Sequence, residues 1–313
     1  MKFKKQPFIF IPLFLIILSI ILFIFLDIDL NSKKNITINS TEISNKWNTF
    51  SNGIYGKIIY AVPPEMHILY LKTGKKIIIP GIKTEGGPGR FNRGKTPRPF
   101  WNRDGTLFVY RFKGNVFISD ETGEKRIIFN PYMDRSKETR WSFTYYKGRE
   151  WIAGPSLSGN VILVNPINPK IFIDLFIENK IDKHCEMTGD GKYIVYDNGK
   201  DIFLKNTFKK GIGMKISFGQ SCRPCASPQK YVGWLPAPHL KYYLYFASDG
   251  KLFKELPAPI NEEIYRLNWS NSDSFAVHMF GSKGNNKMTV RNIHTGKSFF
   301  AGYGWDPDLW VKR

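Results

Sequence analysis

The feature that most constrains the fold is a unit that recurs along the chain. Four segments align without gaps: "PFWNRDGTLFVYRF" from Pro99, "CEMTGDGKYIVYDN" from Cys185, "RPCASPQKYVGWLP" from Arg223 and "LNWSNSDSFAVHMF" from Leu267. In each, an apolar anchor at the third position precedes a tight turn and an aromatic-rich strand. Asp-Gly and Ser-Pro suit such turns because glycine adopts positive φ and proline fixes φ. The repeating unit is therefore an anchor, a hairpin turn and a strand.

The anchors give the length of the unit. They are Trp101, Met187, Cys225 and Trp269, and one less regular unit, "FTYYKGREWIAGPSLSGNVILVNPINPKIFI", lies between the first two. Positions 101 and 269 are thus four units apart, so the mean period is about 42 residues. A second hairpin follows each anchor segment, as in "FISDETGEKRII" and "YFASDGKLFKEL", which makes four strands per unit. Four antiparallel strands at this period are typical of a β-propeller blade.

Six such blades fit the chain. Their expected ranges are 54–82, 97–130, 139–177, 183–217, 221–257 and 264–301. The first blade lacks an inner strand, and "DPDLWV" near the C-terminus resembles the Pro-containing lead to Trp101. Residues 305–311 are therefore expected to supply that strand and close the ring, which removes exposed sheet edges. The alternative source is "NKWNTFSN" around Trp47. The predicted fold is an all-β, six-bladed propeller over residues 53–313.

This pattern resembles a known family. "PFWNRDGTLFVY" followed by "VFISDETGEKRII" is similar to the repeats of the TolB-type, WD-repeat-like β-propellers, over about residues 55–311. The resemblance implies the propeller fold and says little about activity, since such propellers are binding platforms in many systems and lyases or peptidase companion domains in a minority. The first and third blades depart from the pattern because they lack the Asp-Gly hairpin.

The N-terminus has the composition of a membrane anchor. Three lysines precede an uncharged apolar run over residues 7–26, which is long enough for a helix to cross the hydrocarbon core. No A-x-A-like site follows, so an uncleaved signal-anchor is favoured over a cleaved signal. Residues 1–6 would then be cytoplasmic. The polar residues 27–52 would be a linker, and the propeller would be extracytoplasmic, in the periplasm or at the cell surface.

The formal net charge of +20 leaves several partners open. A basic surface suits anionic lipid, polysaccharide or nucleic acid, while scattered lysines also serve solubility and blunt sheet edges. An extracytoplasmic location conflicts with nucleic acid. The expected partners are therefore the membrane, through the N-terminal helix, and a protein or an anionic envelope glycan.

A Gly-rich basic loop precedes the second blade, in "GIKTEGGPGRFNRGKTPRPFW", and "NPYMDRSKETRW" follows that blade. Backbone amides and arginines in such loops can hold phosphate, sulfate or carboxylate, although the need to connect two blades explains the first loop equally well. The candidate anion-binding residues are Arg90, Arg93, Lys95, Arg98, Arg135 and Arg140.

Cys222 and Cys225 form a Cys-x-x-Cys whose role the repeat clarifies. Cys225 occupies an anchor position, where a buried thiol packs as a small apolar group. Cys222 and Cys185 lie near the starts of adjacent inner strands, so a disulfide between them, free structural thiols, and a metal or redox function all remain open. His184 is expected at the channel mouth beside Cys222, as a structural histidine or, less simply, a metal ligand.

Acidic residues complete the candidates. Asp306 and Asp308 in "WDPD" are expected near the channel, while Asp104, Asp190 and Asp249 belong to the repeated turns. The chain contains no G-x-S-x-G, P-loop or dinucleotide motif, and no cofactor or metal site is predicted. The favoured function is a non-catalytic binding or scaffold module. The alternative is a polysaccharide lyase or hydrolase acting at the channel.

Overall fold

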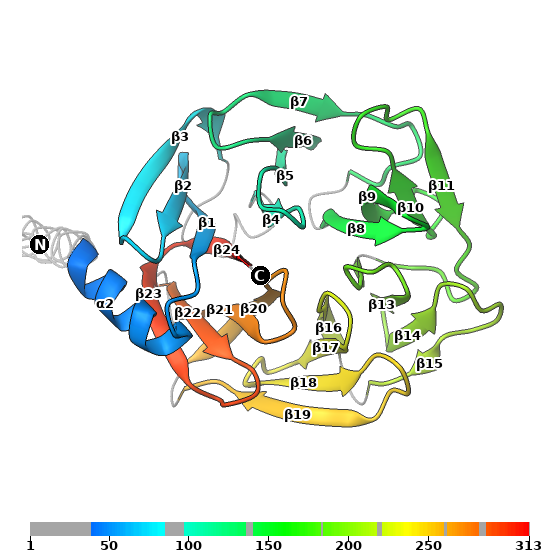
Figure 1. Cartoon of the computed structure of the whole chain (residues 1–313). Coiled ribbons are helices and arrows are strands. Elements are labelled where there is room, and N and C mark those ends of the chain that lie inside the picture. The colour runs from blue at the N-terminus through cyan, green and yellow to red at the C-terminus, as the bar shows by residue number, and fades with distance from the viewer. Residues whose placement is uncertain are drawn as a thin grey trace, which may run out of the picture. The chain divides into compact units, whose positions relative to one another are not determined.

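Six four-stranded antiparallel sheets are arranged around a common centre in the computed structural model of the protein (Figure 1). The structure describes residues 39–84, 97–135, 140–182, 184–217, 221–259, 262–281 and 286–312. Each sheet is one blade, and its strands follow one another outward from the centre. The predicted six-bladed β-propeller with four-stranded antiparallel blades is confirmed.

The blades are numbered in chain order, and their strands are given from the innermost outward. Blade 1 contains β24 (Trp305–Val311), β1 (Gly56–Val62), β2 (Glu65–Tyr70) and β3 (Lys75–Lys83). Blade 2 contains β4 (Phe100–Trp101), β5 (Phe108–Phe112), β6 (Asn115–Ser119) and β7 (Lys125–Ile128). Blade 3 contains β8 (Ser142–Tyr146), β9 (Arg149–Pro155), β10 (Val161–Val164) and β11 (Phe172–Leu175). Blade 4 contains β12 (Cys185–Met187), β13 (Tyr193–Asp197), β14 (Ile202–Asn206) and β15 (Met214–Lys215). Blade 5 contains β16 (Ser221–Ala226), β17 (Tyr231–Pro236), β18 (Lys241–Phe246) and β19 (Leu252–Pro257). Blade 6 contains β20 (Glu263–Trp269), β21 (Phe275–Gly281), β22 (Lys287–Asn292) and β23 (Ser298–Tyr303).

Burial along the strands shows where the core lies. Every residue of β21 is buried, as is every residue of β10, because both faces of each blade pack against a neighbouring blade. The outermost strands β7 and β11 are mostly exposed or half-buried. The core is therefore a set of apolar layers between blades, and no blade encloses a core of its own.

The anchors lie in these layers. Trp101 is 3% exposed and Trp269 is 2% exposed. Trp101 of blade 2 belongs to one apolar cluster with Ile59 and Ile68 of blade 1. Trp269 of blade 6 stacks on Tyr231 of blade 5, with 5.5 Å between ring centroids. The expected burial of the two indoles between blades is confirmed.

The last strand of the chain closes the ring. β24 pairs antiparallel with β1, with Leu309 opposite Ile58, and lies at the centre of the molecule (Figure 1). The sequence analysis expected this strand at residues 305–311, and β24 has those bounds. It is also fixed to both neighbouring blades. The Trp310 indole N–H donates to the carbonyl oxygen of Arg103 at 3.1 Å, and the Val311 N–H donates to Asn271 Oδ1 at 2.9 Å.

One helix departs from the expected polar linker. Within residues 27–52, α2 (Ser40–Ser51) is helical, and residues 27–38 lie outside the described part of the chain. Ile43 and Trp47, four positions apart on one face, are fully buried. The Trp47 ring lies 5.4 Å from the ring of Phe299 of blade 6. The linker prediction is wrong for α2, and the segment around Trp47 is not the closing strand, because it is helical and the Trp47 ring packs on Phe275 and Phe299 of blade 6.

The membrane anchor falls outside the described residues. Residues 1–6 and the apolar run 7–26 are not among them. Across the part of the chain that is described, no helix has both the length and the apolar character needed to span a membrane.

A pair of glycine substitutions tests the contact made by the closing strand. Gly105 and Gly114 have nearly the same positive φ, 74° and 73°, but a Cβ at Gly105 would lie 2.5 Å from the Trp310 ring, whereas one at Gly114 would meet nothing within 4 Å. Both Gly→Ala changes carry the same backbone strain. We expect G105A to lower the free energy of unfolding by about 1–3 kcal/mol more than G114A, measured by urea denaturation. Equal losses would show that Trp310 does not pack tightly on this turn.

Candidate functional site

A pocket lies at the end of the channel where the inner strands finish. All six blades contribute residues to its lining, from the last part of the inner strand or from the turn that follows it. The volume of the pocket is about 100 Å³. That space holds several waters or one inserted side chain. The lining combines aromatic and apolar groups with amides and hydroxyls: Phe100, Phe143, Tyr145, Met187, Trp269 and Pro228, with Asn102, Thr144, Gln229 and Asn271.

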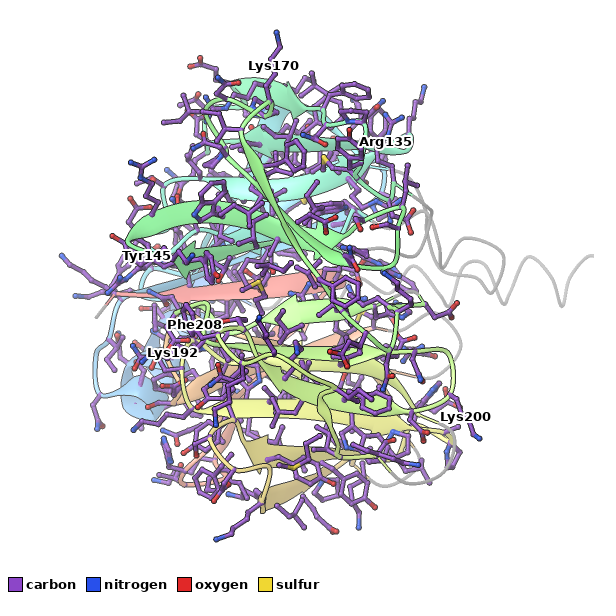
Figure 2. The ribbon with its side chains drawn as sticks, turned by 90° about the vertical axis from the view of Figure 1, so that its right-hand side faces the viewer. Arg135, Tyr145, Lys170, Lys192, Lys200 and Phe208 are labelled. Atoms are coloured by element: carbon purple, nitrogen blue, oxygen red, sulfur yellow. The ribbon has the colours of Figure 1, made fainter. Side chains whose placement is uncertain are left out.

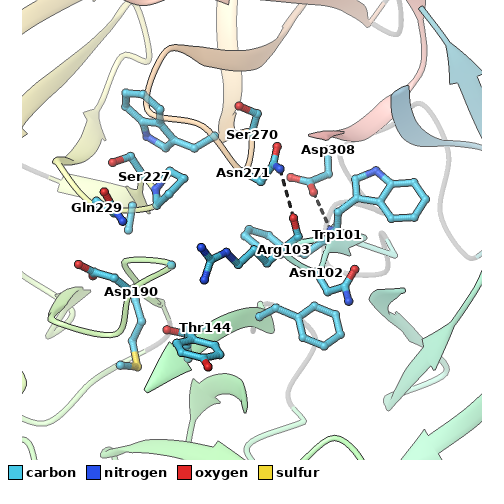
Figure 3. Close-up of a pocket in the computed structure, with 18 of the residues that line it drawn as sticks. Trp101, Asn102, Arg103, Thr144, Asp190, Ser227, Gln229, Ser270, Asn271 and Asp308 are labelled. Carbon is cyan, nitrogen blue, oxygen red and sulfur yellow. Dashed lines mark hydrogen bonds between the residues drawn. The ribbon is translucent and has the colours of Figure 1, made fainter. Parts of the chain in front are cut away.

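Arg103 supplies a cation to this pocket. Its side chain is exposed and extends into the pocket, while its carbonyl oxygen accepts hydrogen bonds from Trp310 and Asn271 (Figure 3). The guanidinium carbon lies 5.7 Å from the centroid of the Tyr145 ring. The backbone of Arg103 is thus held by blades 1 and 6, while its guanidinium is presented over an aromatic face.

The carboxylates of the turns accept hydrogen bonds from hydroxyl and N–H groups of the same turns. Asp190 Oδ1 accepts from the Thr188 hydroxyl at 2.8 Å and from the Lys192 N–H at 3.1 Å. Asp104 accepts from Thr106 in the same way. Glu150, also in the pocket, has its pKa raised, first by burial and then by the charge of Asp104. The structure therefore supports the predicted turn role of Asp104 and Asp190.

The other end of the channel is lined by buried charges. Arg140 Nη1 lies 2.8 Å from Glu186 Oε2, and Arg140 Nη2 lies 3.8 Å from Asp308 Oδ1. Arg266 Nη1 lies 3.4 Å from Asp306 Oδ1. These groups come from the inner strands of blades 1, 3, 4 and 6, or from residues just before them. The pairs therefore connect blades that are far apart in the sequence.

Burial disfavours the charged forms of these groups. It raises the pKa of Asp308 to about 8, against the lowering effect of Arg140 and of the hydrogen bond from the Trp101 N–H. Burial also raises the pKa of Glu186. It lowers the pKa of Arg266, and it lowers that of Arg98 well below its ordinary value, assisted by the nearby charge of Arg266. Burial therefore disfavours the charged forms of both the acids and the bases of this channel.

Among the described residues, three inner strands have a residue at positive φ followed by proline at or near their first residue. Arg98, Arg223 and Asp306 each precede a proline and have φ of 47°, 56° and 45°. Residues before proline favour extended conformations, and positive φ is costly for any residue with a Cβ. Strand register shifts in β16 and opposite β24 accompany two of them.

The predicted anion-binding residues do not form one surface. Arg90, Arg93 and Lys95 lie outside the described residues. Arg98 and Arg140 are buried in the wall of the channel, so they do not belong to an exposed loop. Arg135 is exposed, bonds to Asn115 and lies toward the face opposite Tyr145 (Figure 2).

His184 and Cys185 lie at the charged end of the channel, whereas Cys225 packs in an apolar cluster of blades 5 and 6. His184 Nδ1 is 3.1 Å from Asp197 Oδ2, and its backbone N–H donates to the same oxygen. Cys185 and Cys225 are free, buried thiols whose pKa values burial raises. The side chain of Cys222 lies outside the described residues, so the Cys185–Cys222 disulfide stays a prediction. Among the described side chains, no group of three His, Cys, Asp or Glu residues is placed to hold a metal ion.

Sequence reasoning missed several residues of these two sites, among them Arg103, Tyr145, Glu186, Arg223 and Arg266. A signal existed for Arg266. Arg98, His184 and Arg266 each lie three residues before one of the anchors Trp101, Met187 and Trp269, so this position of the repeat holds a polar side chain more than once. Arg103 gave no such signal, because its turn "NRDG" is explained by hairpin formation alone.

Comparison with known proteins supports the fold alone. No protein-family model and no curated protein sequence matches the chain. Its structure is similar to a propeller in a nidogen/laminin complex, with a TM-score of 0.57, 8% identity and coverage of 81% of this chain and 98% of that one. It is also similar to the Swd1 propeller of Myceliophteria thermophila, with a TM-score of 0.52, 12% identity and coverage of 79% of this chain and 82% of that one. The TM-score with TolB of Acinetobacter baumannii is 0.51, at 14% identity and coverage of 85% of this chain and 70% of that one.

The raised pKa of Asp308 predicts a pH-dependent stability. The folded state keeps the Asp308 proton up to about pH 8, whereas the unfolded chain releases it near pH 4, so wild-type stability falls as pH rises between these values. D308N cannot titrate and keeps an acceptor for the Trp101 N–H. We expect the stability of D308N relative to wild type to increase from about pH 5 to about pH 8, by up to about 1.4 kcal/mol per pH unit. Urea unfolding at several pH values measures this, and parallel profiles would mean that Asp308 is ionised in the folded protein.

Proposed function

We propose that the chain is a non-catalytic binding module that a membrane anchor at residues 7–26 holds outside the cytoplasm. Its partner is a protein that inserts one side chain into the pocket at the turn end of the channel. The observation that carries this proposal is the combination of an apolar pocket with the exposed guanidinium of Arg103 at its centre. Apolar pockets with a few converging polar groups are the usual form of binding sites.

The size and chemistry of the pocket favour a partner's side chain over a large ligand. About 100 Å³ suits one inserted group, and Arg103 favours an acidic group beside it. Gln229 and the Tyr145 ring add a polar and an aromatic contact at the rim. Asp190 is already engaged in its turn, which favours binding over the hydrolase alternative. The nidogen propeller, which has a similar fold, was solved in a complex with laminin.

Site-specific photo-crosslinking in cells that contain the full-length chain tests the proposal. A photo-reactive residue replaces Gln229 at the pocket, or Lys200, which lies toward the opposite face (Figure 2). We expect a discrete protein adduct from position 229 and none from position 200. R103A should lower the yield of the adduct about tenfold, since a hydrogen bond to a charged group contributes about 1.5–3 kcal/mol.

The control is R126A, which removes an exposed arginine from the outer strand β7. It should leave the adduct unchanged. An adduct that carries glycan in place of protein, or equal adducts from both positions, would contradict the proposal of a protein partner at this pocket.

A further inference from the structure

A second, smaller cavity lies at the charged end of the channel. It is lined by Arg140, His184, Cys185, Glu186, Arg223, Pro224, Tyr242, Arg266 and Leu267, from blades 3 to 6, and its volume is about 10 Å³. A space of this size holds a single water or a group of similar size. Three guanidiniums therefore line a space for one small occupant.

Positive charge exceeds negative charge around this cavity. Among the described residues that line the cavity, three are arginines, Arg140, Arg223 and Arg266, and one is a carboxylate, Glu186. Asp197 lies behind the cavity wall, where it contacts His184. An excess of cations in a desolvated space favours an anion, because Coulomb interactions are screened weakly there.

Arg140 retains donor capacity at this position. Its side chain is 7% exposed, and its one short contact to a carboxylate of the described residues is the 2.8 Å pair between Nη1 and Glu186. Its Nε and Nη2 make no hydrogen bond to the part of the chain that is described, and Nη2 lies 3.8 Å from Asp308. Arg223 is held in place by Nη1, which donates to the carbonyl oxygens of Ile264 and Tyr265. A guanidinium with five donors normally satisfies most of them when buried.

We propose that this cavity binds one small anionic group, a halide or a carboxylate oxygen, held by Arg140, Arg223 and Arg266. The bound anion connects blades 3, 5 and 6 through these arginines and compensates the positive charge of the channel. The cavity shares no lining residue with the pocket of the proposed function, because it lies nearer to the beginnings of the inner strands. It does not depend on that function.

Chloride-dependent stability of the full chain is the test. Chloride or acetate replaces the HEPES anion step by step, at constant ionic strength. The sulfonate group of HEPES is too bulky for the cavity. We expect the unfolding equilibrium constant to fall about tenfold for each tenfold rise in chloride above its dissociation constant. The same response to acetate alone would identify a carboxylate as the occupant of the same site. No difference from HEPES would overturn the proposal.

Variants and diffraction locate the effect. R266Q should abolish the chloride dependence, and R135Q, which removes an exposed arginine outside the cavity, should retain it. If R266Q does not fold, anomalous diffraction from wild-type crystals soaked in bromide decides the question. A bromide peak between Arg140, Arg223 and Arg266 is expected. Peaks confined to the outer surface would show an adventitious ion only and would overturn the proposal.

Discussion

The pairing of β24 with β1 is the interaction on which the rest of the structure depends. A propeller blade buries its apolar faces only against its neighbours, so a ring with a gap exposes two faces at once. Blade 1 contains the first and the last strand of the propeller, and its four-stranded sheet is complete only when both are paired. Lys57 of β1 strengthens this closure. Its buried ammonium lies 4.3 Å from the Trp101 ring and donates to the carbonyl oxygen of Gly105 at 2.6 Å.

Closure also creates the electrostatics of the channel. Asp306 and Asp308 lie on the closing strand, and they reach Arg266 of blade 6 and Arg140 of blade 3. Buried ion pairs return little net stability because desolvation offsets their attraction, but removal of one partner is costly. The channel therefore favours the single register in which the acids of β24 meet these arginines. The same closure fixes the Arg103 carbonyl, so the ring and the candidate binding pocket depend on one strand.

Much of the fold was predictable because the repeat marks the residues that pack between neighbouring blades. Trp101 and Trp269 mark positions that must be buried between blades, and their spacing sets the blade length whatever the intervening residues are. Helix α2 was not predicted, because its overall composition is polar and its contacts with blade 6 come from two aromatic residues, Trp47 and Phe50. The sites were harder to predict. Arg98 and Arg140 were identified, but as residues of exposed binding loops, whereas the structure buries both in the wall of the channel. Arg103 and Tyr145 come together only through the ring.

Hydrogen exchange on a chain that ends at Gly304, compared with the full chain, tests this account most directly. If β24 closes the ring and the blades depend on one another, loss of β24 should remove amide protection from β13 and β17, which are far from blade 1, as well as from β1. Loss of protection confined to β1 and β2, with the other blades unchanged, would contradict the account.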